Sequence, residues 1–313
     1  MAKICVVGSV NMDIVTYVND IPVRGQTVNG KELVETAGGK GANQAVAVAK
    51  QNKDVALIGC IGDDYHGDML LQRLREYNVD TSKLKQLQDT ASGKTSIVVE
   101  DSGENFIIYL EGANKKLDKG YVRNTIQAEK NCEVLLVQLE SPYDVVLEAM
   151  KTAHEQGIKV ILDPAPSNHV TDELLQYAHL VLPNEQETRE ITGITITDEA
   201  SALTAATIFK QKGIEQGVLK VGATGSYVFD KQDMTFIDAI QVKAIDTVGA
   251  GDCFAGAFAS AYVDGLSLVE AAKHANIVAA LKVTKAGAQD GIPTQKEVKD
   301  FCAERNLPCY VTK

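Results

Sequence analysis

Apolar residues along this chain follow two alternating patterns. Continuous apolar runs of strand length lie at residues 3–7, 55–61, 134–139, 159–162, 180–182 and 217–221. Between them, the spacing i, i+3, i+4, i+7 predicts amphipathic helices at residues 41–52, 67–77 and 145–156. This alternation predicts an α/β fold in which a mostly parallel sheet carries helices on both faces.

Two segments, at about residues 16–36 and 92–111, interrupt this alternation because they contain no helical period. The second predicts a β-hairpin over residues 94–110 with its turn at residues 101–103. The first contains a predicted strand at residues 28–34. Since both segments flank the glycine-rich motifs described below, we expect them to form one small sheet that acts as a lid; the alternative is that they only decorate the surface.

Composition narrows the possible functions. The 313 residues include 31 Lys and Arg against 42 Asp and Glu, so the net charge is -11, which disfavours nucleic acid and anionic membranes as partners. No apolar run reaches the roughly 18 residues of a membrane span, and the first residues lack the features of an export signal. Six cysteines without a C-x-x-C pair complete the prediction of a cytoplasmic protein with reduced thiols.

The most informative motif is DTVGAGD at residues 246–252, which precedes an apolar helical stripe. Gly249, Ala250, Gly251 and Asp252 should therefore lie at a helix N-terminus, where unpaired N–H groups and the helix dipole bind anions. A carboxylate at such a site suits a general base that takes a proton from a hydroxyl attacking a phosphoryl group. The alternative is a capping aspartate after a tight turn.

A second glycine-rich motif, GGKGAN at residues 38–43, opens the helix predicted at residues 41–52. Its glycines allow a ligand to approach the backbone, and Lys40 and Asn43 supply hydrogen-bond donors. The motif is neither a Walker A loop nor a dinucleotide-binding fingerprint. It predicts a site for a phosphate or a hydroxyl-rich ligand, or else a tight turn into a packed helix.

Polar residues follow several predicted strands, namely Asn11, Asp13, Glu140, Asn184 and Glu187. Open α/β sheets bind ligands at the carboxyl ends of their strands. A carboxylate there can bind two sugar hydroxyls, and an amide with a carboxylate one helical turn away can orient water or Mg²⁺. Turns and helix caps explain the same residues equally well.

The pairing of GGKGAN with DTVGAGD, together with NEQE at residues 184–187, resembles the ribokinase branch of the pfkB-type carbohydrate and nucleoside kinases. The resemblance covers essentially the whole chain and implies one three-layer α/β/α domain, residues 1–313, with a β-sheet lid that also forms a homodimer. It implies ATP-dependent phosphorylation of the 5-hydroxyl of D-ribose. Deoxyribose, fructose and nucleosides remain alternative substrates, and a non-catalytic sugar or nucleotide sensor is a further alternative.

The resemblance also assigns roles to individual residues. The implied catalytic residues are Gly249, Ala250, Gly251 and Asp252. Asp252 would be the base, and the backbone N–H groups of Ala250, Gly251 and Asp252 would form an anion hole. The implied sugar site consists of Asn11, Asp13, Gly39, Lys40, Gly41, Ala42, Asn43, Glu140 and Asp252. The implied ATP site consists of Asn184, Lys220, Val221, Gly222, Ala223, Thr224, Gly225, Gly251, Asp252 and Asn276.

Two metal ions are implied by the same resemblance. Mg²⁺ would accompany ATP near Glu187. An activating K⁺ would be held, largely through backbone carbonyls, by Asp246, Val248, Lys282, Lys285, Gly287 and Gly291. These residues come from two segments, 246–248 and 282–291. A cation bound to both segments would keep the N–H groups of the anion hole oriented toward their ligand.

Overall fold

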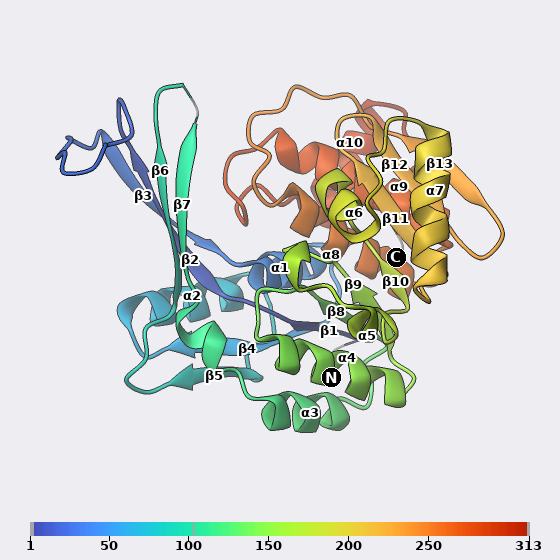
Figure 1. The fold of residues 1–313 in the computed structure, drawn as a ribbon, viewed down its shortest axis with the longest axis horizontal. Coiled ribbons are helices and arrows are strands. Elements are labelled where there is room, and N and C mark those ends of the chain that lie inside the picture. The colour runs from blue at the N-terminus through green and yellow to red at the C-terminus, as the bar shows by residue number, and fades with distance from the viewer. Residues whose placement is uncertain (1–2, 103, 312–313) are drawn as a thin grey trace.

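The computed structural model describes residues 3–102 and 104–311, which form three layers around a central sheet (Figure 1). In these residues a nine-stranded sheet has the order β13-β12-β11-β10-β9-β8-β1-β4-β5. Its strands are β1 (Ile4–Val7), β4 (Val55–Gly62), β5 (Leu84–Leu87), β8 (Val134–Val137), β9 (Lys159–Leu162), β10 (Leu180–Val181), β11 (Gly217–Val221), β12 (Gly225–Phe229) and β13 (Met234–Asp238). The seven strands β11, β10, β9, β8, β1, β4 and β5 are parallel to one another. At the other edge, β12 is antiparallel to β11, and β13 is antiparallel to β12.

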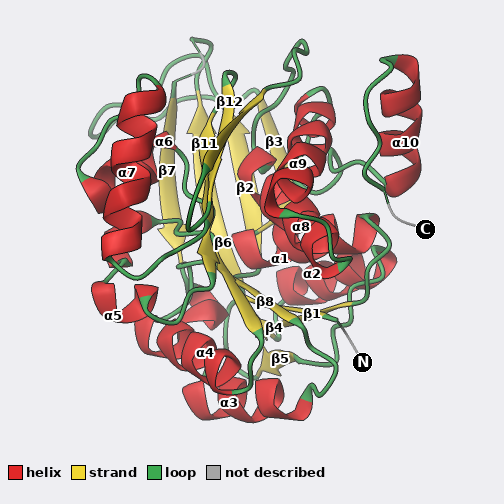
Figure 2. Cartoon of the chain, turned by 90° about the vertical axis from the view of Figure 1, so that its right-hand side faces the viewer, coloured by secondary structure: helices red, strands yellow, loops and turns green. Residues whose placement is uncertain are grey.

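Helices cover both faces of this sheet, as Figure 2 shows. One face carries α1 (Lys40–Lys50), α2 (Tyr65–Glu76), α8 (Ala250–Val263), α9 (Leu268–Val283) and α10 (Gln295–Glu304). The other carries α3 (Lys119–Ala128), α4 (Tyr143–Glu155), α5 (Asp172–Leu175), α6 (Glu185–Thr192) and α7 (Glu199–Gln211). Successive residues of β1 alternate between the two cores: Ile4 and Val6 join one, and Cys5 and Val7 the other. The predicted α/β class with a mostly parallel sheet is confirmed.

A second, four-stranded sheet projects from this body with the order β3-β2-β6-β7 (Figure 1). Its strands are β2 (Asn11–Tyr17), β3 (Glu32–Gly38), β6 (Gly93–Val99) and β7 (Asn105–Leu110). The predicted hairpin corresponds to β6 and β7, although Gly103 of its turn lies outside the described residues. We call these four strands the small sheet.

The boundaries predicted for the first segment of the small sheet were wrong. The segment expected at about residues 16–36 begins earlier, with β2 at Asn11, and the strand predicted at residues 28–34 lies at residues 32–38. Strand pairing sets these bounds, because β2 and β3 are paired from Asn11 with Gly38 to Tyr17 with Glu32. The pairing therefore extends into the polar residues at the start of β2. A polar pattern of this kind does not indicate a strand in the sequence.

Two further predictions can be compared with the described residues. None of their helices has the length and apolar character needed to cross a membrane. All six cysteines are free thiols, and five of them are buried, with only Cys309 exposed.

Close packing between α1 and α8 brings the two glycine-rich motifs together. A side chain added at Gly256 would lie 2.5 Å from Cβ of Ala47 and 2.7 Å from the carbonyl oxygen of Gln44. Glycine at this point therefore lets the helix backbones approach each other. As a result, the first turns of α1 and α8 face one another at the carboxyl ends of the strands.

Candidate active site

Asp252 lies in the first turn of α8 and is 6% exposed. Its Oδ2 accepts a hydrogen bond from Nδ2 of Asn43 at 2.9 Å, and its Oδ1 accepts one from Nε2 of Gln44 at 3.3 Å. Burial raises the pKa of Asp252 to about 6, against the opposing effect of the Lys40 ammonium. A carboxylate with a pKa near neutrality is well suited to accept a proton from a hydroxyl group.

The N-terminus of α8 offers fewer free donors than expected. Gly249 caps the helix in the left-handed conformation, with φ of 73°. The N–H of Ala250 donates to the carbonyl oxygen of Thr247 at 3.1 Å, so the prediction of a free donor at Ala250 was wrong. The tight turn uses that donor to enter the helix. Among the described residues, the N–H groups of Gly251 and Asp252 have no acceptor, so these two donors are available to an anion.

Glu140 links the start of α1 to the end of β1. Its Oε2 accepts hydrogen bonds from Oγ of Ser9 at 2.5 Å and from the backbone N–H of Lys40 at 3.2 Å. The pKa of the Lys40 ammonium is raised above its ordinary value, mainly by the charge of Asp252. The positive charge of Lys40 thus balances part of the negative charge of Asp252 and Glu140.

Asp13 and Asn11 project from β2 of the small sheet toward the same place. Burial raises the pKa of Asp13 to about 6, with the charges of Glu140 and Asp252 adding to the effect. Gly38 on the paired strand leaves the space that the Asp13 carboxylate occupies, because a Cβ there would clash with it. Asn11 is buried, and its Oδ1 accepts a hydrogen bond from Nδ2 of Asn114 at 2.7 Å.

Within the GGKGAN motif, the residues divide between the site and the packing behind it. Gly39 has φ of 88°, and a Cβ there would lie 2.8 Å from the backbone nitrogen of Asn11. Gly41 and Ala42 are fully buried, and a Cβ at Gly41 would lie 2.5 Å from the carbonyl carbon of Gly8. We therefore assign Gly41 and Ala42 to the packing of the motif against β1.

A buried polar network behind Asp252 was missed in the sequence. Nε2 of Gln44 donates to Oδ2 of Asp163 at 2.9 Å as well as to Asp252, and Oε1 of Gln44 accepts from Nε2 of Gln138. Nζ of Lys220 forms an ion pair with Oδ1 of Asp163 at 3.0 Å. Asp163 directly follows β9, the same placement that singled out Glu140, so a signal for it was present.

On the expected nucleotide side, Asn184 and Glu187 form the capping box of α6. The N–H of Glu187 donates to Oδ1 of Asn184, and Oε2 and Oε1 of Glu187 accept from the backbone N–H and Nδ2 of Asn184, each at 2.8 Å. The helix-cap alternative for this pair is therefore realised. Burial raises the pKa of Glu187, whereas the nearby Lys220 lowers it.

Residues 220–225 comprise the end of β11, the turn that follows it and the first residue of β12. Gly222 has φ of 54° and Gly225 has φ of 142°, and the N–H of Thr224 donates to the carbonyl oxygen of Val221 at 3.1 Å. Val221, Gly222 and Ala223 complete the turn between the strands. Asn276 on α9 lies beside this loop, with its Nδ2 donating to Oγ of Ser226 at 3.2 Å.

Asp246 connects the two loops that were expected to hold K⁺. Its Oδ1 accepts from the N–H of Val248 at 2.9 Å, and its Oδ2 accepts from the N–H of Gly287 at 2.8 Å. Lys282 is fully buried and donates from Nζ to the carbonyl oxygen of Asp246 at 3.0 Å. The side chain of Lys282 therefore supplies a positive charge here and not a ligand.

Carbonyl oxygens converge beside Gly291. A Cβ at this glycine would lie 2.6 Å from the oxygen of Gly287, and 3.1 Å from the oxygens of both Ala286 and Lys285. The Lys285 side chain is directed away and pairs with Glu297. The oxygen of Gly287 accepts a hydrogen bond from the N–H of Gly291 at 3.0 Å, which leaves the oxygens of Ala286 and Lys285 as candidate ligands for a monovalent cation. The described residues contain no cluster of three His, Cys, Asp or Glu side chains for a metal.

Comparisons with known proteins identify the family of this chain. The model of the pfkB family carbohydrate kinases matches residues 1–295. The chain belongs to the pfkB family of carbohydrate kinases. Together with the ribokinases described next, this match confirms the family membership, the kinase activity and the resemblance to ribokinases.

Among the relatives of this pfkB-family kinase are two bacterial ribokinases. Ribokinase from Haemophilus influenzae is 39% identical over 296 residues, covering 95% of this chain and 97% of that protein. Ribokinase from Bacillus subtilis is 36% identical over 301 residues, covering 96% and 99%. The solved structure of Arabidopsis thaliana ribokinase complexed with ribose and ATP has a TM-score of 0.89, with 30% identity and coverage of 96% and 98%.

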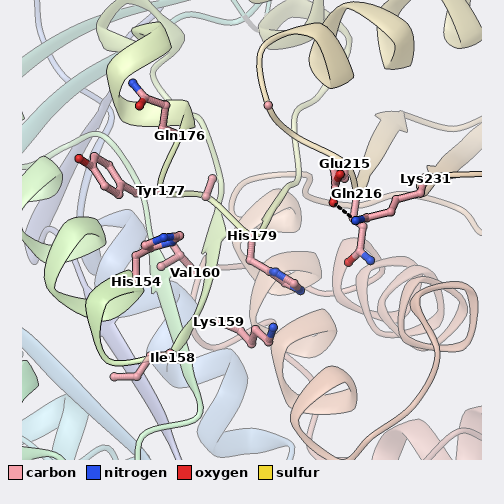
Figure 3. Close-up of a pocket in the computed structure, with 13 residues that line it drawn as sticks. His154, Ile158, Lys159, Val160, Gln176, Tyr177, His179, Glu215, Gln216 and Lys231 are labelled. Carbon is pink, nitrogen blue, oxygen red and sulfur yellow. Dashed lines mark ion pairs between the residues drawn. The ribbon is translucent and has the colours of Figure 1, made fainter.

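This kinase also has a hollow at the opposite end of its main sheet, drawn in Figure 3. Its volume is about 410 Å³, and it lies where β9, β10 and β11 begin. Lys159, His179 and Lys231 contribute to its lining, and Lys231 pairs with Glu215 at 2.6 Å. The hollow contains none of the predicted site residues, which gather at the carboxyl ends of the strands.

Proposed function

We propose that this protein transfers the γ-phosphoryl group of ATP to the 5-hydroxyl of D-ribose. The single observation that carries the proposal is the buried Asp252 at the N-terminus of α8, hydrogen-bonded to Asn43 of the GGKGAN motif. The ribokinase relatives support D-ribose as the sugar, and the plant enzyme complexed with ribose and ATP supports both substrates.

The sugar would bind where β2 and the start of α1 meet. Asp13, Glu140 and Asn43 offer two carboxylates and an amide for its hydroxyl groups, since charge-assisted O–H···O bonds are short and strong. Gly39 leaves the backbone accessible, while Asn11 is held in place by Asn114. Deoxyribose would lose one of these hydroxyl contacts, which favours ribose when the carboxylate is buried.

Asp252 would accept the proton of the 5-hydroxyl group. The hydroxyl oxygen of the sugar would form a bond to the γ-phosphorus while the bond between the γ-phosphorus and the leaving ADP oxygen breaks. The N–H groups of Gly251 and Asp252 would stabilise the charge spread over the phosphoryl oxygens. ATP would lie across Asn184, residues 220–225 and Asn276, beside these donors. The two sides of the reaction thus meet at the first turn of α8.

Two metal ions belong to this proposal. Mg²⁺ bound to the ATP phosphates would neutralise developing charge. Both oxygens of Glu187 already accept hydrogen bonds from Asn184, so Glu187 would reach the ion through water. K⁺ would be held by the carbonyl oxygens near Gly291 and by the loop that begins at Asp246, which keeps the neighbouring anion hole rigid.

The small sheet would act as a lid and as the contact of a homodimer. All of β7 is exposed, and its apolar residues Phe106, Ile107, Ile108, Tyr109 and Leu110 are 40–56% accessible. Because β7 is also an edge strand, it offers unpaired backbone groups and apolar side chains to a second copy of the sheet. A cytoplasmic location remains a prediction from the sequence.

The test is a coupled assay of ADP release with D-ribose, deoxyribose, fructose and nucleosides as acceptors. We expect the highest kcat/KM with D-ribose and a product phosphorylated at the 5-hydroxyl. A clear preference for another acceptor would replace ribose by that sugar. The absence of ADP release with every acceptor, despite measurable ATP binding, would contradict the kinase proposal and favour the sensor.

A further inference from the structure

Asp163 and Asp252 are two buried carboxylates that share one amide group. Asp163 is 3% exposed and Gln44 is fully buried. Nε2 of Gln44 donates to Oδ2 of Asp163 at 2.9 Å and to Oδ1 of Asp252 at 3.3 Å. Because Gln138 donates to the other end of the Gln44 amide, the NH₂ group is oriented toward the two acids.

Lys220 completes this network on the side of the anion hole. Its Nζ is 3.0 Å from Oδ1 of Asp163, and its side chain is 14% exposed. A Cβ added at Gly251 would lie 3.8 Å from the same Nζ. The ammonium therefore lies near Gly251, whose N–H group has no acceptor within the described part of the chain.

Charge balance shows why an ammonium at this point matters. Asp252 is surrounded by the charges of Asp13, Glu140, Asp163 and Lys40. A transferring phosphoryl group would add negative charge to a place where acids already outnumber bases. An ammonium has three donors, and the Asp163 bond uses one of them, so others remain for phosphoryl oxygens.

We propose that the Lys220 ammonium contacts the transferring phosphoryl group, and that Asp163 and Gln44 position Lys220 relative to Asp252. This inference rests on the proposed kinase function and extends it to three residues of one hydrogen-bonded chain. Lys220 acts on the phosphoryl oxygens as a cation, while Asp163 holds the ammonium and Gln44 keeps the distance between the two carboxylates fixed. No new bond or redox step is required.

The first test compares Lys220→Met, Lys220→Arg and Lys231→Met. Lys231 is the matched control because it also pairs with a carboxylate, Glu215 (Figure 3), and it lies away from the site, in the hollow where β9, β10 and β11 begin. We expect Lys220→Met to lower kcat about 10²- to 10³-fold with the KM for the sugar nearly unchanged. Lys220→Arg should recover part of the loss, and Lys231→Met should match the wild type.

A second variant, Asp163→Asn, keeps the size of the side chain and removes its charge. The charge of Asp163 raises the pKa of Asp252, so Asp163→Asn should move the acid limb of the kcat/KM profile to lower pH. At pH 8, kcat should fall about tenfold because Lys220 loses its ion-pair partner. A purely structural role would not move the limb.

The outcomes separate this inference from the proposed function. If the wild type phosphorylates a sugar but folded Lys220→Met retains kcat within threefold of it, the inference is wrong and the kinase proposal stands. An unshifted acid limb in Asp163→Asn would likewise overturn the positioning role of Asp163. If the wild type phosphorylates no sugar, the proposed function fails and the inference fails with it.

Discussion

Asn43 donates a hydrogen bond from Nδ2 to Oδ2 of Asp252 at 2.9 Å, across 209 residues of sequence. The bond joins the GGKGAN motif at the start of α1 to the DTVGAGD motif at the start of α8. Both side chains are nearly inaccessible to water, which strengthens the bond and fixes the carboxylate in one orientation. A sugar hydroxyl that reaches Asp252 must therefore approach along the surface that Asn43 also lines.

Replacing the base tests the centre of this arrangement. Asp252→Asn should keep the shape of the side chain but lose proton acceptance, so kcat should fall about 10²- to 10⁴-fold. The affinity for the sugar, measured by titration calorimetry, should change little. Asp233→Asn, on an exposed turn before β13, is the control. Turnover by Asp252→Asn near the wild-type rate would remove the assignment.

The pH dependence of kcat/KM should report the buried carboxylates. Burial raises the pKa of both Asp252 and Asp13 to about 6, from the ordinary value of 3.8. The active form is ionised, so activity should be full well above pH 6 and should fall as the pH drops through 6. Initial rates from pH 4.5 to 9 at low sugar concentration measure this limb. Constant activity down to pH 5 would contradict the raised pKa values.

The cation site can be tested through Asp246, which pins both loops with its carboxylate oxygens. The wild type should be faster in K⁺ than in Na⁺ or a bulky organic cation. Asp246→Ala should lower kcat about 10- to 100-fold and raise the K⁺ concentration needed for half activation, because the anion hole loses its support. Equal wild-type rates in all three cations would exclude activation by K⁺.

Dimer formation should depend on the exposed strand β7. Ile107→Lys places a charge in its apolar row and should convert a dimer to a monomer at micromolar concentrations, as measured by sedimentation velocity. Leu203→Lys on α7 is the matched control, since Leu203 is also an exposed apolar residue, at 52%. A monomeric wild type, or a dimer that survives in Ile107→Lys, would refute this contact.

His274 on α9 should contribute to acid sensitivity. It is 4% exposed, and its Nδ1 has no hydrogen-bond partner among the described residues. Burial lowers the pKa of His274 to about 4 from 6.5, so the folded state favours the neutral ring. This contribution to stability is present above pH 6.5 and is lost as the pH falls toward 4, amounting to about 3 kcal/mol.

Urea unfolding of the wild type and His274→Gln at pH 7.5, 6.0 and 4.5 measures this effect. The free energy of unfolding should fall less steeply in the variant than in the wild type. Comparing the two proteins removes the opposite contribution of Asp252 and Asp13, whose raised pKa values stabilise the folded state as the pH falls. Identical slopes would show that His274 titrates normally.

Local patterns in the sequence determined the order of strands and helices and the class of site. Strands β9 and β11 have the predicted bounds, and α8 begins at Ala250, as the glycine turn before it requires. Periodicity, glycine turns and capping residues act over a few neighbouring positions, so they can be read without the fold. The paired motifs also sufficed to identify the family.

Only the tertiary structure decided which side chains meet. Gly256 against Ala47 sets the spacing of α1 and α8, and that spacing places Gln44 between Asp163 and Asp252. The turn that starts α8 takes the N–H of Ala250, leaving two donors where three were expected. These features depend on distances between segments far apart in the chain, which arise from packing and strand register and leave no periodic signal in the sequence.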